Sequence, residues 1–168
     1  MSRRKEREKA TVAMQILILE DNEERQAAMR ECLKDRFHQF AVRFFDAADE
    51  MIEFLDRHLP STILISLDHD LELKHGSDGK SIDPGTGRQV ADFLARRPPQ
   101  CPVVIATTNS SAAVGMEMAL QEARWTTYRV LPFNDLEWVT AQWFPVVRRA
   151  IVASARRAAE RYSASGGA

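Results

Sequence analysis

The sequence predicts one α/β domain built on a five-stranded parallel sheet with helices on both faces. Short apolar runs, typical of strands buried on both faces, alternate with segments whose apolar residues recur at helical spacing. This alternation occurs five times along the chain, a pattern that favours a single parallel sheet. A chain of 168 residues, 45% hydrophobic and 28% charged, is long enough to bury one substantial core.

The predicted strands and helices follow one another in a regular order. Asn22 and Asp46 are expected to cap the first two helices, because their side chains can accept backbone N–H groups. Asn134, with Glu137 three residues later, has the pattern of a capping box for the last helix. Pro145 is expected to kink that helix or to restart it. Strands are expected at 14–19, 41–45, 63–67, 102–106 and 127–131.

We expect the strand order 2-1-3-4-5 of flavodoxin-like folds, which places strands one and three side by side at the topological switch point. The domain is expected to cover residues 13–161. Residues 1–12 are interpreted as a basic, disordered lead-in and residues 162–168 as a small, polar, disordered tail. The stretch 68–85 shows no periodicity, so we expect a long loop of the kind that often binds ligands.

Composition and charge argue against several classes of protein. The sequence has no apolar run long enough to cross a membrane and no signal-peptide pattern, so we expect a cytoplasmic protein. Two cysteines, Cys32 and Cys101, do not indicate a disulfide framework or a zinc site. Both ends are basic although the net charge is −1, and we interpret them as solvated. A nucleic-acid partner is not expected, because basic and aromatic residues do not alternate.

Acidic residues follow two strands that the topology brings together. Glu20 and Asp21 end the first apolar run, and Asp68 and Asp70 follow the third. Converging carboxylates repel one another, and a hard cation with oxygen ligands, Mg²⁺ or another divalent ion, relieves that repulsion. Two other interpretations stay open. Glu20 and Asp21 can be first-turn acids that favour the helix dipole, and Asp68 can simply cap the next segment.

Further polar residues stand at the same predicted edge of the sheet. His69 can be a general acid or base, a ligand for a transition metal, or a hydrogen-bonded structural group. Thr107, Thr108 and Asn109 follow the fourth strand and offer donors that suit phosphate oxygens. Asn109 or Ser110 can also cap the helix that follows, and both roles are compatible.

These positions resemble the receiver domain of two-component response regulators. Glu20 and Asp21 match its acidic pair, Asp68 its phosphoacceptor, and Thr107 its hydroxyl residue after the fourth strand. The resemblance implies that the three carboxylates bind Mg²⁺, with the backbone carbonyl of Asp70 as a further ligand. It also implies that Asp68 accepts a phosphoryl group and that Thr107 transmits the change to the far face.

The sequence departs from ordinary receivers after the fifth strand, where Leu131-Pro132 replaces Lys-Pro and removes a phosphate-binding charge. The run Leu-Asp-His-Asp-Leu at 67–71, followed by Thr86-Gly87, resembles the divergent cyclic-phosphate-processing branch of receivers. That branch carries a His-Ser-x-Asn motif after the fourth strand, and here Thr-Thr-Asn at 107–109 lacks the histidine. The resemblance implies a phosphate ligand that can be cyclic.

Three functions follow from these patterns. In the first, a magnesium-dependent site binds or processes a phosphorylated ligand, which can be a cyclic phosphate. The residues that position or process this ligand are Asp68, His69, Asp70, Thr107 and Asn109. In the second, the chain is a single-domain response regulator that a phosphodonor protein phosphorylates on Asp68 and that then binds a signalling partner. In the third, it is a pseudo-receiver that acts as a protein-interaction module. Whether the chain is an enzyme is left open between them.

Overall fold

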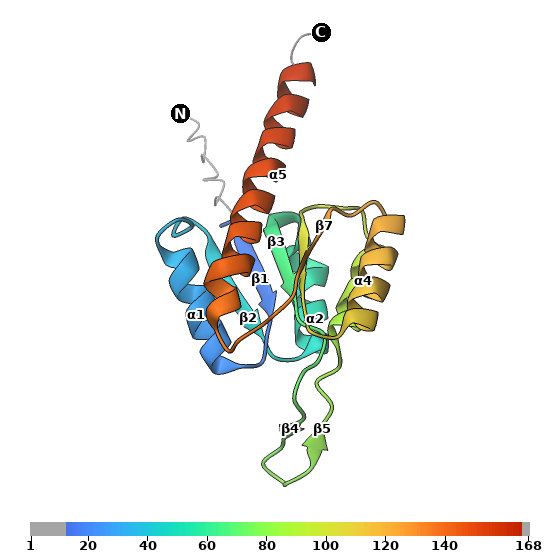
Figure 1. Cartoon of the computed structure of the whole chain (residues 1–168). Coiled ribbons are helices and arrows are strands. Elements are labelled where there is room, and N and C mark those ends of the chain that lie inside the picture. Colours follow the sequence, from blue (N-terminus) through green and yellow to red (C-terminus); the bar gives the residue numbers. More distant parts are fainter. Residues whose placement is uncertain (1–12, 166–168) are drawn as a thin grey trace, which may run out of the picture.

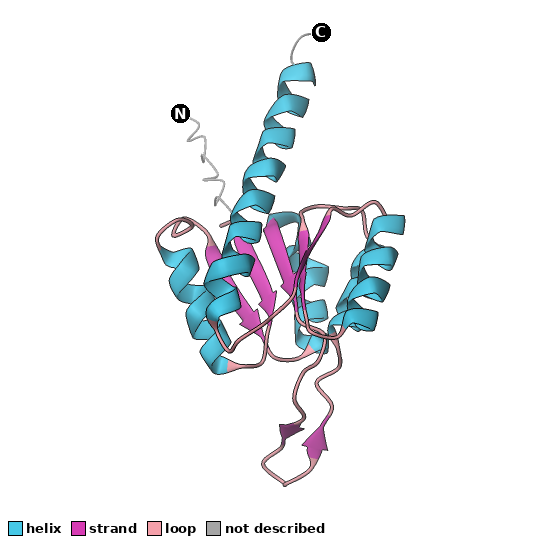
Figure 2. Cartoon of the chain, in the orientation of Figure 1, coloured by secondary structure: helices cyan, strands magenta, loops and turns pink. Residues whose placement is uncertain are grey.

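The computed structural model describes residues 13–165, with side chains as far as residue 160. Its centre is a five-stranded parallel sheet with the order β2-β1-β3-β6-β7 (Figures 1 and 2). This is the predicted order 2-1-3-4-5, since β6 and β7 are the fourth and fifth strands of the sheet. The strands are β1 Gln15–Leu19, β2 Ala41–Phe45, β3 Thr62–Leu67, β6 Val103–Ala106 and β7 Thr127–Val130.

Helices cover both faces of the sheet, which gives three layers (Figure 1). Side chains of β1 alternate between these layers, because successive residues of a strand point to opposite faces. Ile16 and Ile18 pack under α1 and α5, whereas Leu17 and Leu19 pack under α2, α3 and α4. All four are essentially inaccessible to solvent. The helices are α1 Glu23–Lys34, α2 Ala48–His58, α3 Gly87–Ala95, α4 Ser110–Glu122 and α5 Phe144–Ser165.

The two ends of the sheet differ. The C-terminal half of α5 projects past one end, and a hairpin projects past the end at which the strands finish (Figure 1). The helix α5 continues to Ser165 and so includes the first residues of the predicted tail. Residues 1–12 and 166–168, on which the rest of the predicted disorder falls, lie outside the described residues. No helix within residues 13–165 has the length and apolarity needed to cross a bilayer.

Of the N-caps predicted for the first two helices, one is confirmed and the other is wrong. The Asn22 side chain accepts a hydrogen bond from the backbone N–H of Arg25 at 2.9 Å, so the predicted cap of α1 is confirmed. The predicted cap of α2 is wrong, because the N-cap position is Ala47. Asp46 instead accepts a hydrogen bond from Lys74 Nζ at 2.6 Å. A charge-assisted bond to a distant lysine engages the carboxylate that the cap would have used.

The last helix starts later than the capping-box pattern predicts. Asn134 and Asp135 adopt left-handed φ angles of 39° and 43°, so this segment is a turn and the capping-box prediction is wrong. A π-helical stretch, Val139–Trp143, follows the turn and leads into α5. Pro145 is the second residue of α5, directly after the π-helical stretch, and the N–H of Phe144 donates to the carbonyl of Val139, so the chain enters α5 without a break in the helix. Trp143 is buried and donates from Nε1 to Ser66 Oγ at 3.0 Å.

The predicted long loop after β3 contains a small hairpin, which we call the arm (residues 71–85). Its two short antiparallel strands are β4 Lys74–His75 and β5 Ser81–Ile82. A β-bridge between Asp70 and Thr86 closes the base of the arm. From this base the arm projects away from the body of the domain (Figure 1).

Candidate functional site

Two neighbouring parallel strands bring the acidic residues together. Leu19 of β1 lies opposite Leu67 of β3 in the ladder, so the next residues, Glu20 and Asp68, leave the sheet side by side. The backbone N–H of Asp68 donates to the carbonyl of Leu19 at 3.0 Å, and that of Glu20 donates to Phe45 at 2.9 Å. The sheet hydrogen bonds therefore extend to the site residues and hold their backbones in place.

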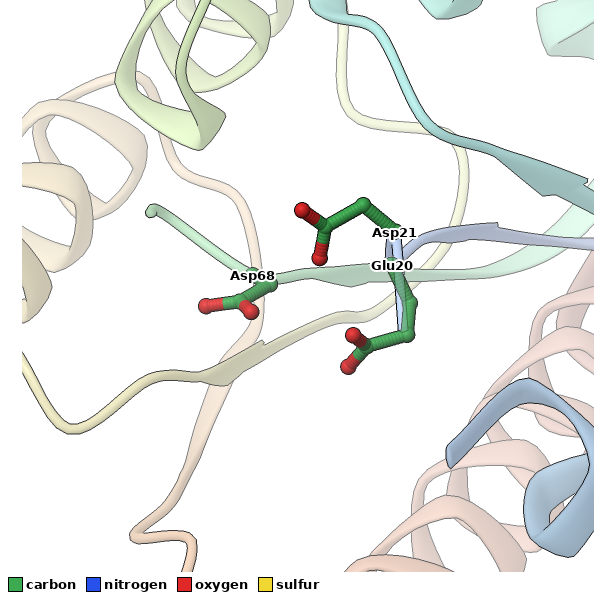
Figure 3. Close-up of side chains that lie close together, drawn as sticks. All are labelled: Glu20, Asp21 and Asp68. Carbon is green, nitrogen blue, oxygen red and sulfur yellow. The ribbon is translucent and has the colours of Figure 1, made fainter. Parts of the chain in front are cut away.

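The carboxylates of Glu20, Asp21 and Asp68 converge on one space (Figure 3). One oxygen from each lies within 4.8 Å of those of the other two. Glu20 is 2% exposed and Asp68 is 7% exposed. An all-carboxylate set of this size suits a hard divalent cation such as Mg²⁺, which prefers oxygen ligands.

The electrostatics of the cluster also fit a cation. Burial, followed by the charge of Asp68, raises the pKa of Glu20 to about 7. Burial likewise raises the pKa of Asp68 to about 6, although the N–H of His69, the charge of Arg25 and the Thr107 hydroxyl act in the opposite direction. Without a cation, these carboxylates therefore hold their protons at pH values where an exposed acid is ionised.

Backbone donors orient the three carboxylates. Glu20 Oε1 accepts the N–H of Asn22 at 3.0 Å, and Asp68 Oδ1 accepts that of His69 at 2.6 Å. Asp21 Oδ2 accepts the N–H of Glu72, at the start of the arm, at 2.5 Å. A carboxylate has about four lone-pair sites, so each group keeps acceptor capacity for a cation.

A polar cavity of about 320 Å³ opens over two of these carboxylates. Its volume is at the lower end of the range for small-molecule sites. Its walls come from the start of α1, the strand ends, the base of the arm and the loops after β6 and β7. The lining residues are Asp21, Asn22, Arg25, Asp68, Asp70, Leu71, Glu72, Thr108 and Pro132.

A second cavity, of about 260 Å³, is not a candidate for this chemistry. It lies at the opposite end of the sheet and is lined mainly by apolar groups, among them Met14, Phe40, Ile63 and Ile151. Among the residues that the structure describes, no carboxylate, histidine or basic side chain lines it. The described lining therefore offers no charged partner for a phosphate or a metal ion.

The remaining predicted residues surround the cavity in different ways. Asp70 lines it, with a side chain that is 63% exposed. His69 does not line it. Its Nε2 lies 3.8 Å from Asp70 Oδ1, and its buried Nδ1 has no hydrogen-bond partner within the described part of the chain.

The loop after β6 places its polar residues at three different positions. The Thr107 hydroxyl bonds to Asp68 beneath the cavity, and it also accepts the N–H of Asn109 at 3.2 Å. Asn109 caps α4 through Ala112 N at 3.1 Å, and its Nδ2 lies 3.5 Å from Asp70 Oδ1. Thr108 is the residue of this loop that lines the cavity itself.

Sequence reasoning missed Arg25, which lies in the first turn of α1. Its Nη1 is 3.7 Å from Glu20 Oε1 and 3.7 Å from Asp68 Oδ2. Its spacing from Asn22 could have indicated this position. A residue three positions after the N-cap lies in the first turn of the helix, and that turn begins beside the end of the preceding strand.

The first residue of α3, Gly87, lies directly against the backbone at the end of β3. A Cβ at this position would collide with the carbonyl oxygen of Asp68, and the N–H of Gly87 donates to the carbonyl of His69 at 3.2 Å. The preceding Thr86 forms a capping box with Gln89. The Thr-Gly pair therefore allows α3 to begin directly against the backbone of the strand-three acids.

A sequence profile of the cyclic-phosphate processing receiver domain matches residues 15–122. The chain belongs to this family. No curated protein matches the sequence. Together with the acidic cluster, the family makes this protein a receiver domain with a set of carboxylates able to bind a divalent cation.

Solved structures share the fold of this receiver domain at low sequence identity. The signal receiver domain of a putative LuxO repressor protein from Vibrio parahaemolyticus is 17% identical, with a TM-score of 0.60 over 87% of this chain and 95% of that one. The phosphorylated cyanobacterial phytochrome response regulator RcpA is 18% identical, with a TM-score of 0.53 over 80% and 89%. The Mn²⁺-bound response regulator Rcp1 is 20% identical, with a TM-score of 0.53 over 80% and 88%.

Proposed function

We propose that this receiver domain binds Mg²⁺ through Glu20, Asp21 and Asp68 and uses the site to bind and process a cyclic phosphate. The observation that carries the proposal is the convergence of three carboxylates within 4.8 Å at a polar cavity. The family to which the chain belongs is described by cyclic-phosphate processing. The backbone carbonyl of Asp70 is proposed as a further ligand. A receiver with bound Mn²⁺ supports a divalent cation in this fold.

The proposed reaction is hydrolysis of a cyclic phosphodiester. The oxygen of a water molecule bonds to phosphorus, one ring P–O bond breaks, and the departing oxygen takes up the proton that the water loses. The cation, when bound, polarises a phosphoryl oxygen. Thr108 lines the cavity and donates a hydrogen bond to the phosphate.

Proton transfer is assigned to the Asp70 carboxylate, which lines the cavity and can accept the proton of the attacking water. His69 is proposed to act through Asp70, because its Nε2 lies 3.8 Å from Asp70 Oδ1. Thr107 orients the Asp68 carboxylate through its hydroxyl. Asn109 contacts the same oxygen of Asp70 as His69 does, with its Nδ2 at 3.5 Å from Asp70 Oδ1.

A second candidate is a single-domain response regulator phosphorylated on Asp68. The strand-end position of Asp68, its bond to Thr107 and its acidic neighbours favour it. In that reaction an Asp68 oxygen bonds to the phosphorus of a phosphodonor, and the bond to the donor's leaving group breaks. Leu131 counts against it, because this 56% exposed aliphatic side chain supplies no charge to a phosphoryl group.

One experiment separates these functions. The protein and the variants Asp68→Asn and Glu31→Gln are incubated with Mg²⁺ and a panel of cyclic nucleotides and cyclic phosphates, and products are followed by ³¹P NMR. Glu31 is a matched control, because its side chain is 69% exposed and its ion pair with Lys34 lies away from the cavity. We expect turnover by wild type and Glu31→Gln that EDTA and Asp68→Asn abolish.

The same proteins are treated with acetyl phosphate and measured by intact mass. A stable phosphoryl adduct on wild type but not on Asp68→Asn, without turnover of any cyclic phosphate, would establish the response-regulator function instead. Neither turnover nor adduct, together with no Mg²⁺ binding, would leave a pseudo-receiver that acts by binding protein.

A further inference from the structure

The guanidinium of Arg25 is held close to the acidic cluster without being bound tightly to it. Its Nη1 lies 3.7 Å from both Glu20 Oε1 and Asp68 Oδ2, beyond the 2.7–3.2 Å of an N–H···O hydrogen bond. Within residues 13–165 the guanidinium donates no hydrogen bond at that shorter range. Its side chain is 33% exposed and lines the polar cavity. A guanidinium has five N–H donors, so most of its donor capacity is available to a ligand.

A buried tryptophan lies beside the guanidinium of Arg25. The guanidinium carbon lies 5.8 Å from the ring centroid of Trp138, within the range of a cation–π contact. Trp138 is 1% exposed and is itself held by a bond from its Nε1 to the carbonyl of Asp135 at 3.0 Å. The ring therefore supports the guanidinium of Arg25, whose side chain lines the cavity.

Among the described residues, Arg25 is the only basic side chain that lines this cavity, whereas Asp21, Asp68, Asp70 and Glu72 contribute four carboxylates. A phosphate that enters such a cavity meets strong repulsion unless positive charge opposes it. A cation on the carboxylates supplies part of that charge. Lys74 of the arm is paired with Asp46 at 2.6 Å and does not line the cavity.

We propose that Arg25 is the phosphate-recognition residue of this site and binds two unesterified oxygens of one phosphate through its planar guanidinium. The inference deepens the proposed function and rests on it. A guanidinium matches two phosphate oxygens in a bidentate arrangement that an ammonium group cannot reproduce. Ligands with two unesterified oxygens on phosphorus, including cyclic phosphodiesters and inorganic phosphate, meet this requirement. Phosphotriesters do not.

The competing explanation is that Arg25 only balances the charge of Glu20 and Asp68. The two roles make opposite predictions. A charge-balancing arginine competes with Mg²⁺, so its removal would tighten Mg²⁺ binding and leave phosphate binding unchanged. A phosphate-recognition arginine is needed for phosphate even when Mg²⁺ is saturating.

The test measures binding of Mg²⁺ alone, and of inorganic phosphate at saturating Mg²⁺, by isothermal titration calorimetry. The variants are Arg25→Gln, Arg25→Lys and the control Arg30→Gln. Arg30 is also on α1 and also rests on an aromatic ring, with its guanidinium carbon 4.5 Å from the centroid of Phe44, but it does not line the cavity. Circular dichroism confirms that each variant is folded.

We expect Arg25→Gln to weaken phosphate binding by about tenfold or more, because it removes charge-assisted hydrogen bonds, and to leave Mg²⁺ binding intact. Arg25→Lys keeps the charge against the carboxylates and should fall between Arg25→Gln and wild type. Arg30→Gln should equal wild type. Phosphate affinities of Arg25→Gln and Arg25→Lys within about twofold of wild type would overturn the inference. Failure of wild type to bind Mg²⁺ would overturn the proposed function itself.

Discussion

At the scale of single residues, the site depends on the carboxyl groups of Glu20 and Asp68. Burial of these two groups opposes their ionisation. The pKa of Glu20 rises from 4.5 to about 7, and that of Asp68 rises from 3.8 to about 6. The folded protein therefore holds these protons to higher pH than the unfolded chain does. Their contribution to stability is fully present at low pH and is lost as pH rises through about 6 and 7. A bound cation reverses this loss, because it binds the ionised forms.

This reversal predicts that stabilisation of the fold by Mg²⁺ depends on pH. We expect a fixed concentration of Mg²⁺ to raise the unfolding midpoint more at about pH 8 than at about pH 5, because protons compete for the carboxylates at the lower pH. Thermal unfolding followed by circular dichroism measures this. Glu20→Gln removes one of the titrating groups and should flatten the dependence. An Mg²⁺ effect of equal size at both pH values in the wild type would contradict the prediction.

Residue types showed which groups share the edge of the sheet, but not how they are oriented. Glu20, Asp21 and Asp68 were predicted to meet because strand order alone decides it. The sequence could not predict that Asp46 bonds to Lys74 rather than capping α2, because that bond joins segments that come together only in the folded chain. For the same reason Arg25 was missed. Its role depends on where the first turn of α1 lies over the ends of β1 and β3.

At the scale of elements, a close approach of two backbones at Gly87 shapes the site. The start of α3 lies so near the end of β3 that a methyl group at position 87 meets the carbonyl of Asp68. We expect Gly87→Ala to lower the free energy of unfolding by roughly 1–3 kcal/mol, because one of two backbones must move. It should also weaken Mg²⁺ binding, because Asp68 moves with its backbone. Urea denaturation and calorimetry measure the two effects.

Gly115 provides the matched control. A Cβ there would lie 2.6 Å from Arg88 Nη1, the end of a flexible and half-exposed side chain that can swing away. Gly115 is also inside α4, where alanine favours the helix by about 1 kcal/mol. Gly115→Ala should therefore be neutral or stabilising. If Gly87→Ala behaved in the same way, the close packing of α3 against β3 would not be the constraint that we describe.

The elements also show where periodicity predicts structure and where it does not. The five strands were predictable because buried parallel strands consist of short apolar runs. The π-helical stretch Val139–Trp143 was not, since it differs from an α-helix only in its hydrogen-bond pattern. The hairpin of the arm was missed because β4 and β5 have two residues each, too few to show alternation.

At the scale of the whole molecule, the two projections lie at opposite ends of the sheet (Figure 1). The arm begins beside the cavity. Hydrogen bonds from Glu72 to Asp21 and from Lys74 to Asp46 attach it to the domain. Among the side chains of α5 that the structure describes, the last buried one is Ile151, and residues 155–160 are exposed or half-buried. The core of the domain is therefore complete before the helix ends.

This arrangement predicts that the end of α5 is dispensable for folding and for the site. A chain that stops after residue 155 should keep its free energy of unfolding within about 0.5 kcal/mol, because the described residues that it loses, 156–160, are exposed or half-buried. Its Mg²⁺ affinity should equal that of the full chain, since the cavity lies at the other end of the sheet. By contrast, Val147→Ala, in the fully buried part of the same helix, should cost roughly 1–3 kcal/mol. Urea denaturation and Mg²⁺ calorimetry of the three proteins test this. A large loss of stability in the truncated chain would mean that the projecting half of α5 supports the fold, through self-association or contacts of its own.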